Sequence, residues 1–373
     1  MEKPQILNIE KIVFGGKGLA RYNGQVVFIE GGLPGEKVKV LLKPGKHFFT
    51  GKIKEILTPS PFRIENSCKF KECGGCDFRH CSYKYEIELK KAMLIDTLKR
   101  IGKIEIDQEF IELHFSKRDH YRIKTGFKAK RNKIGFFKKK SHLIVDIDYC
   151  LQVPEQVNKR LKEIRDKRIK KDFFIEIHPF KKETYFYFKG EKGKEIEIRF
   201  EKYLMFHKTG NFVQANRDLL KEFVEVVKEF AGEGESLLEL YCGSGLFTLP
   251  LSFNYTEIHA YEHSESAIEM LEKSIKENSL KNISVYNLPA ENFEIQNYST
   301  IVVDPPREGL SGVVLKKVLN SKPEKIVYIS CNASTFARDF KTLSTNYTLE
   351  RLALIDNFPA TAHFETVALL RRR

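Results

Sequence analysis

The chain has 373 residues, 42% of them hydrophobic, which is enough for two or three domains with sizeable cores. Its net charge of +14 is uneven: residues 1–200 hold 45 Lys and Arg against 27 Asp and Glu, and residues 201–373 hold 19 against 23. The first half is therefore expected to meet a polyanion such as RNA, although a basic surface can also be merely solvated.

No apolar run reaches the roughly 20 residues that a membrane helix needs. The N-terminus, Met1-Glu2-Lys3-Pro4, lacks the apolar stretch of a signal peptide. We therefore expect a cytoplasmic protein without a membrane contact, in which thiols stay reduced. Nothing in the sequence demands more than a monomer.

Residues 1–60 are predicted to form a small β-barrel of the oligonucleotide-binding (OB) kind. Short runs of strand character occur at Gln25–Ile29, Lys37–Leu41 and Gly51–Ile56, and the turn-forming sequence at 31–35 separates the first two. Short strands at this spacing are typical of such barrels.

A cysteine-rich stretch follows, with the pattern Cys68-x4-Cys73-x2-Cys76 and two glycines between the last two cysteines. Seven cysteines in a reducing compartment indicate metal binding and catalysis rather than disulfides. A fourth ligand is required, and the candidates are Cys81 and Cys150. The spacing alone does not choose between zinc and an iron–sulfur cluster.

The central segment, residues 61–204, is predicted to be a mixed domain that binds RNA. A helix is expected from about Tyr83 to Ile101, where it can pack on the C-terminal domain, with Gly102 as its stop. Its apolar side consists of Ile87, Leu94, Ile95 and Leu98. Residues 110–200 alternate basic and apolar side chains, which indicates antiparallel strands with a basic outer face.

Residues 205–373 alternate strand and helix, the rhythm of a Rossmann-like α/β domain with a parallel sheet. A helix is expected over Ser264–Asn278. The predicted buried strands are Ser236–Leu240, Ile258–Tyr261, Ile283–Tyr286, Thr300–Val303 and Lys325–Ser330.

A glycine turn follows the first of these strands and predicts a cofactor site. Gly243 and Gly245 allow a ligand to approach the backbone closely, and Glu262 at the end of the next strand can accept hydrogen bonds from ribose hydroxyls. Thr248 stands where a dinucleotide fingerprint would need a third glycine. The pattern therefore favours S-adenosylmethionine over NAD. The neighbouring Cys242 is expected to be a packing residue.

Three further segments carry candidate reactive groups: Asp304-Pro305-Pro306-Arg307, Ser330-Cys331-Asn332 and the run from Phe358 to Glu365. The first two end predicted strands, and ligands of open sheets bind at the carboxyl ends of strands. We therefore expect all three segments to face one crevice. His363 in the last segment is expected to be structural or to contact a base.

With these segments, the chain resembles the RNA uracil-5-methyltransferase family, and in particular its members with an N-terminal TRAM domain and an iron–sulfur cluster that act on 23S ribosomal RNA. The match covers nearly the whole chain and includes Phe212-Val213-Gln214-Ala215-Asn216. The family usually has Pro at the position of Ala333 and Gln at that of Arg79, and these departures touch supporting geometry only.

The resemblance implies a β and α/β multidomain fold with S-adenosylmethionine and a [4Fe–4S] cluster as cofactors. It implies Cys331 as nucleophile and Glu365 as base. Around the cofactor and the target base it places Gln214, Tyr241, Glu262 and Asp304. As cluster ligands it implies Cys68, Cys73, Cys76 and Cys150.

The chemistry of uridine methylation explains these residue types. Carbon 5 of uracil is a poor nucleophile, and addition of a thiolate to carbon 6 activates it. A carboxylate must then remove the carbon 5 proton so that the thiolate can leave. Three alternatives stay open: the same reaction on the T-loop uridine of tRNA, a non-catalytic RNA-binding factor, and a zinc-dependent nucleic-acid-binding protein with a dehydrogenase-like C-terminal half.

Overall fold

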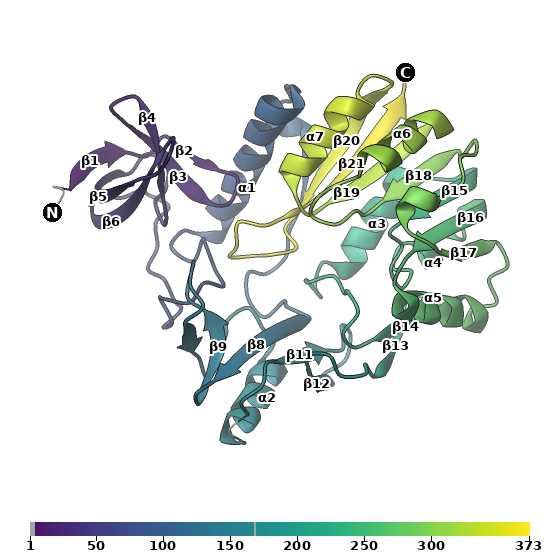
Figure 1. Cartoon of the computed structure of the whole chain (residues 1–373), viewed down its shortest axis with the longest axis horizontal. Helices are drawn as coiled ribbons and strands as arrows, with labels where there is room; N and C mark the ends of the chain where they lie inside the picture. The colour runs from purple at the N-terminus through teal and green to yellow at the C-terminus, as the bar shows by residue number, and fades with distance from the viewer. Residues whose placement is uncertain (1–3, 168) are drawn as a thin grey trace.

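The computed structural model describes residues 4–167 and 169–373 (Figure 1). The first three residues, part of the start where we expect no signal peptide, lie outside the described residues. None of the described helices is long and apolar enough to cross a membrane. The described residues form three sheets and one hairpin, and a long helix runs between the first sheet and the last (Figure 1).

The N-terminal segment, for which short strands were predicted, forms a six-stranded sheet. Its strand order is β1-β5-β6-β4-β3-β2. The strands are β1 (Gln5–Asn8), β2 (Lys11–Val13), β3 (Lys17–Tyr22), β4 (Gln25–Ile29), β5 (Lys37–Pro44) and β6 (Phe49–Thr58). Alternate residues face its small core, as in β5, where Val38 and Val40 are fully buried. The predicted strands at 25–29, 37–41 and 51–56 are all present.

Helix α1 (Tyr83–Thr97) links the N-terminal sheet to the C-terminal one. Ser82 caps its N-terminus by accepting a hydrogen bond from the Tyr85 backbone N–H. The helix continues as a π-helical turn over Leu98–Gly102. Met93, Leu94 and Leu98 are fully buried in the core that also contains side chains of helix α7.

A five-stranded sheet with the order β10-β9-β8-β11-β12 forms the middle of the chain. Its strands run antiparallel to their neighbours. They are β8 (Lys124–Lys130), β9 (Lys133–Phe137), β10 (Ile144–Asp146), β11 (Phe173–Ile177) and β12 (Thr184–Phe188). Helix α2 (Glu155–Asp166) covers one face through Val157, Leu161 and Ile164. The hairpin of β13 (Glu195–Phe200) and β14 (Tyr203–Lys208) then leads towards the last sheet.

The C-terminal sheet has eight strands in the order β17-β16-β15-β18-β19-β21-β20-β7. Its strands are β7 (Ile111–His114), β15 (Gly234–Leu240), β16 (Tyr255–Glu262), β17 (Ile283–Asn287), β18 (Thr300–Val303), β19 (Lys325–Ser330), β20 (Tyr347–Ile355) and β21 (Glu365–Arg372). The five strands from β17 to β19 are parallel, and β21 is antiparallel to both of its neighbours. Strand β7 adds to the edge beside β20, which the sequence pattern does not predict.

Helices cover both faces of this sheet, so its central strands are buried on both sides. In β18, Ile301 and Val303 face the core formed with α1, α6 and α7, whereas Val302 faces the core formed with α3, α4 and α5. The helices are α3 (Leu220–Ala231), α4 (Thr248–Leu251), α5 (Glu265–Glu277), α6 (Gly312–Ser321) and α7 (Ala333–Leu343). Short 3-10 turns occur at Gln108–Phe110 and Ala290–Asn292. The Rossmann-like architecture predicted from the sequence is present.

Candidate active site

The ends of four parallel strands bring the candidate residues to one edge of the C-terminal sheet. Tyr241 follows β15, Glu262 ends β16, Asp304 follows β18 and Cys331 follows β19. These strands are neighbours in the order β16-β15-β18-β19 and run in the same direction. Their carboxyl ends therefore face one crevice, the usual ligand position of such sheets.

Glu365 reaches the same edge from an antiparallel strand. It is the first residue of β21, and the next residue, Thr366, pairs with Ser330 at the end of β19. The Thr366 hydroxyl also donates to the Ser330 carbonyl at 3.2 Å. Cys331 follows Ser330 and Glu365 precedes Thr366, so both lie one position beyond this pair at the same end of the two antiparallel strands. The structure thus brings the nucleophile candidate and the base candidate together.

The glycine loop after β15 is held open by backbone geometry that few residues tolerate. Tyr241, Gly243 and Gly245 have φ values of +64°, +56° and +88°. The Gly243 N–H donates to a carboxylate oxygen of Glu262 at 3.1 Å. The other oxygen of Glu262 accepts from the His263 and Ser264 N–H groups at 2.9 Å. Glu262 is therefore fixed at the loop, where a cofactor would lie.

Burial raises the pKa of several acidic groups at this edge. It raises the pKa of Asp304 to about 7 and that of Glu239, in β15, to about 8. The pKa of Glu365 lies well above its ordinary value, first through burial and then through the nearby Asp304. Burial, followed by the charges of Glu365 and Asp304, raises the pKa of the Cys331 thiol to about 11. Such a group of carboxyls favours a ligand with positive charge, such as a sulfonium.

Gln214 lies on an extended segment that contacts the loop between β20 and β21. Its side chain is buried, and its carbonyl oxygen accepts a hydrogen bond from the Asn357 amide at 2.8 Å. The Asn216 N–H donates to the Asn357 side-chain oxygen at 3.0 Å. The loop of residues 356–364, which leads directly to Glu365, is therefore anchored on the Gln214 segment at its start.

A buried charged network anchors the same loop on α1. The fully buried Lys90 ammonium contacts Glu86 at 2.8 Å and Asp356 at 2.6 Å. Arg118 contacts the other Glu86 oxygen at 2.9 Å. Glu86 also accepts a hydrogen bond from the Ala360 N–H at 2.7 Å. Because each charge has partners, the network can exist in the interior, and it fixes the loop at its start, Asp356, and at its middle, Ala360.

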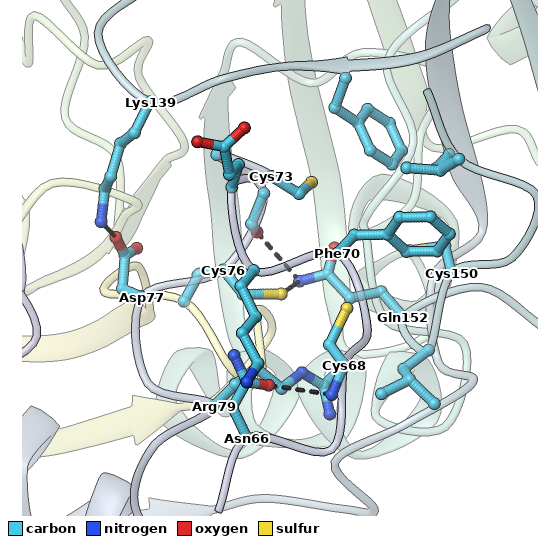
Figure 2. A pocket seen from close by; sticks show the side chains of 18 of the residues that line it. Asn66, Cys68, Phe70, Cys73, Cys76, Asp77, Arg79, Lys139, Cys150 and Gln152 are labelled. Atoms are coloured by element: carbon cyan, nitrogen blue, oxygen red, sulfur yellow. Dashed lines mark hydrogen bonds and ion pairs between the residues drawn. The ribbon is translucent and has the colours of Figure 1, made fainter. Parts of the chain in front are cut away.

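The four cysteines implied as cluster ligands line one cavity of about 820 Å³, seen in Figure 2. They are Cys68, Cys73, Cys76 and Cys150. Cys81 is not among the lining residues; it is fully buried and donates to the Phe78 carbonyl. As placed, no three or more Cys, His, Asp or Glu side chains of the described chain form a metal-binding group.

The surroundings of these thiols nevertheless fit an anionic group in the cavity. Arg79 lines the cavity and is buried, and its Nε and Nη2 atoms have no hydrogen-bond partner within the described chain. Gln152 donates to the Cys76 sulfur at 3.4 Å (Figure 2). Buried donors that face sulfur atoms are the environment in which a cluster held by thiolates is stabilised.

Comparison with known protein families agrees with this arrangement. Residues 126–373 match the family model described as tRNA (uracil-5-)-methyltransferase. The chain belongs to this family. A second model, the TRAM domain, matches residues 5–49, the greater part of the N-terminal sheet. The protein is accordingly an RNA (uracil-5-)-methyltransferase that depends on S-adenosylmethionine.

Individual relatives extend over the whole chain. An uncharacterized RNA methyltransferase of Aquifex aeolicus is 32% identical, over 99% of each chain. The 23S rRNA (uracil(1939)-C(5))-methyltransferase of Pectobacterium atrosepticum is 28% identical, over 95% of this chain and 90% of that protein. The crystal structure of Pyrococcus abyssi tRNA (uracil-54, C5)-methyltransferase with S-adenosyl-L-homocysteine has a TM-score of 0.76 and 24% identity, and covers 98% of this chain and 99% of that one. The last likeness shows that the fold is shared.

The departures from the family pattern have local explanations. Ala333 is the first residue of α7, a position where proline is favoured but where alanine also fits, since the N–H there needs no partner within the helix. Arg79 forms an ion pair with Asp119 in addition to facing the cysteine cavity. Neither change displaces a reactive group.

Two residues of the candidate segments were given no role of their own from the sequence. Arg307 is the cation that lowers the pKa of both Cys331 and Glu365, against the effect of burial. Asn332 caps α7 and donates to the Arg307 carbonyl at 3.0 Å, so it joins the two loops that follow β18 and β19. Their positions directly after the Asp-Pro-Pro and Ser-Cys motifs were the available signal.

Proposed function

We propose that this enzyme methylates carbon 5 of a uridine in 23S ribosomal RNA, with Cys331 as nucleophile and Glu365 as base. The observation that carries the proposal is the register of β19 and β21, which sets these two residues side by side at the carboxyl edge of the sheet. Tyr241, Glu262 and Asp304 lie at the ends of neighbouring strands at this edge, and Gln214 contacts the loop that leads to Glu365. These four residues would hold the methyl donor and the target base.

In the first step, the Cys331 thiolate adds to carbon 6 of uracil, and the electrons of the double bond move into the carbonyl to form an enolate. Carbon 5 of this enolate would then take the methyl group, while the bond between the methyl carbon and the donor sulfur breaks and S-adenosylhomocysteine is left. S-adenosylmethionine, when bound, supplies an electrophilic methyl on a sulfonium. Asp304 and Glu262 favour this positive charge, because they are carboxyl groups at the same edge.

In the second step, the Glu365 carboxylate removes the carbon 5 proton. The electrons of that C–H bond form the new double bond between carbons 5 and 6, and the bond between carbon 6 and sulfur breaks. Cys331 leaves as a thiolate, which suits sulfur as both nucleophile and leaving group. The target base must be unstacked for both faces to be reached, which costs a few kcal/mol.

The choice of ribosomal RNA rests on the relative from Pectobacterium, whose name states that substrate and which matches 95% of this chain. The T-loop uridine of tRNA is the second candidate, favoured by the description of the family model. Both are uridines in structured loops, where a flipped base costs less than in a duplex.

We further propose that Cys68, Cys73, Cys76 and Cys150 hold a [4Fe–4S] cluster that positions the central domain and RNA. The shared cavity and the unpartnered donors of Arg79 support this assignment. Methyl transfer needs no electrons, so the cluster would supply no redox step. Iron and sulfide analysis with visible absorbance tests its presence: zinc alone would contradict it, as would turnover that depends on redox state.

A three-part organisation accompanies this function: a TRAM barrel over 1–60, a cluster and RNA-binding domain over 61–204, and a methyltransferase domain over 205–373.

The test of the function is methyl transfer from labelled S-adenosylmethionine to unmodified 23S rRNA and tRNA, with mapping of 5-methyluridine. Methylation of 23S rRNA by wild type and not by Cys331→Ala is expected. Methylation of tRNA alone would replace the substrate, and methylation by Cys331→Ala would refute the mechanism.

A further inference from the structure

The cysteine-rich stretch of residues 68–81, which we call the cysteine loop, contacts the loop that leads to Glu365, and this contact has no part in the mechanism above. One Asp77 oxygen accepts a hydrogen bond from the Ala362 N–H at 3.0 Å, although the two residues lie 285 positions apart. The other oxygen pairs with Lys139, as Figure 2 shows. Ala362 lies three residues before Glu365.

A strained residue in the same loop shows that the loop is held from outside. Ala360 has a φ of +65°, a conformation that residues with a side chain rarely adopt. Both of its backbone groups are occupied by other segments. Its carbonyl accepts from the Asp77 and Phe78 N–H groups at 2.8 and 3.0 Å, and its N–H donates to Glu86.

The N-terminal sheet closes the loop from another side. Gly16, in the turn between β2 and β3, lies so close that a Cβ there would be 2.8 Å from the Ala362 Cβ. Phe14 contacts Phe364 edge-on, with ring centroids 6.1 Å apart. The turn between β2 and β3, the cysteine loop and α1 thus surround residues 360–364. Asp77 is the residue of the cysteine loop whose side chain accepts a hydrogen bond from the backbone of this segment.

We propose that Asp77 is a positioning residue for the base Glu365. Its carboxylate fixes the backbone at Ala362, and thereby the direction in which Glu365 meets carbon 5 of the methylated adduct. This inference rests on the proposed function. Loss of Asp77 would then slow proton removal and release of Cys331 more than it slows the preceding addition and methyl transfer.

The neighbouring ion pairs provide a matched control. Three successive lysines pair with acids of other segments: Lys138 with Glu72, Lys139 with Asp77, and Lys140 with Glu30. Glu72 lies in the same cysteine loop as Asp77, and among the described residues its hydrogen bond is with the adjacent lysine, Lys138. Glu72→Ala therefore removes a carboxylate and its ion pair with a lysine, and leaves the hydrogen bonds of the loop of residues 356–364 in place.

The experiment follows single turnovers on unmodified 23S rRNA with methyl-labelled S-adenosylmethionine. Total label in RNA reports methyl transfer, and label in RNA bound to denatured protein reports the covalent adduct. We expect Asp77→Ala to transfer methyl within about threefold of the wild-type rate and to raise the adduct fraction about tenfold. Asp77→Asn, which keeps one acceptor oxygen, should lie between, and Glu72→Ala should match the wild type.

Parallel loss of methyl transfer and adduct in Asp77→Ala would overturn the inference, as would wild-type values for both. If Asp77→Ala does not unfold cooperatively, the adduct fraction of Asp77→Asn decides by the same criterion. Two further variants separate this inference from the proposed function. Cys331→Ala must form no adduct, and Glu365→Gln must accumulate it; if either variant behaves otherwise, the mechanism itself is refuted. If both behave as expected and Asp77→Asn has the wild-type adduct fraction, only the role of Asp77 is refuted.

Discussion

Cys331 lies in an environment that opposes its own ionisation. The thiol is half-buried, and two carboxyl groups, Glu365 and Asp304, add to the effect of burial that raises its pKa to about 11. Arg307 is the cation that acts in the opposite direction. The thiol that we propose as nucleophile is therefore expected to be protonated at neutral pH, and the proposed first step has to begin with loss of that proton.

A pH dependence follows from this raised pKa. Because thiolate is the reactive form and its pKa lies above neutrality, the rate of adduct formation should rise about tenfold per pH unit from pH of about 6.5 to about 9. Rapid-quench measurement on RNA containing 5-fluorouridine isolates this step, since its fluorine blocks the later proton removal. A rate that falls with pH over this range would contradict the prediction.

Arg307 provides the control for the same profile. Arg307→Gln removes the cation that lowers the pKa of Cys331, so the rate at pH of about 7.5 should fall and the whole profile should shift to higher pH. Arg307→Lys keeps the charge and should shift the profile less. Identical profiles for the two variants would mean that the guanidinium acts through geometry rather than through charge.

At the scale of secondary structure, the glycine loop after β15 contains two glycines with different requirements. Both have positive φ, but a Cβ on Gly245 would lie 2.5 Å from Leu271 Cδ1 of α5, whereas a Cβ on Gly243 would meet nothing within 4 Å. Gly245 is therefore required by packing as well as by backbone conformation, and Gly243 by conformation only.

Alanine at these two positions should give different results. Gly245→Ala should displace α5 or the loop, lower the affinity for S-adenosylhomocysteine by about tenfold or more and reduce the melting temperature. Gly243→Ala should cost about 1–2 kcal/mol of backbone strain without the displacement. Calorimetric titration and thermal unfolding measure both effects, and a larger loss in Gly243→Ala would contradict the packing argument.

Helix α1 and the loop after β20 depend on one buried ammonium group. Lys90→Met would leave the carboxylates of Glu86 and Asp356 buried without their common cation. Removal of one partner from such a network costs about 3–5 kcal/mol, which denaturant unfolding can measure. Lys84→Met, at an exposed position of the same helix, is the control and should change stability by about 0.5 kcal/mol or less. Equal effects would contradict the assigned role of Lys90.

The elements that could be predicted from the sequence are those whose own residue pattern shows that they are buried. Strands β18 and β19 have the predicted bounds, because strands buried on both faces appear as continuous apolar runs. Strand β7 did not stand out, since Ile111–His114 is short and half polar, and its pairing with β20 depends on residues far along the chain. The helix from about Tyr83 to Ile101 was predicted, but not the π-helical form of its last turn, Leu98–Gly102, which contacts α7.

The residues of the candidate site likewise include some that could be predicted from the sequence and some contacts that could not. Cys331, Asp304 and Glu262 could be placed together because parallel strands share an edge, and Glu365 was found through its motif. The contact of Asp77 with Ala362 could not be foreseen, because nothing in the local sequence of either residue indicates the other. Interactions between loops of different domains are set by the packing of whole sheets, which composition does not encode.

At the scale of the whole molecule, the basic half combines structural and exposed cations. Lys138, Lys139 and Lys140 form a run of positive charge in the sequence, yet each pairs with an acid of another segment. Together they connect the middle sheet to the cysteine loop and the N-terminal sheet. Lys71, in contrast, lies exposed at the cavity that the cysteines line. Part of the positive charge therefore serves assembly of the fold.

RNA affinity should distinguish these two kinds of lysine. A cation that contacts phosphate releases counterions on binding, so its removal lowers the slope of log affinity against log salt by about one. We expect this change in Lys71→Gln. Lys140→Gln removes a lysine already paired with Glu30, so the slope should change less. Filter binding of 23S rRNA across a salt series measures both slopes. An unchanged slope in Lys71→Gln together with a reduced slope in Lys140→Gln would mean that RNA displaces Glu30 and binds the lysine run directly.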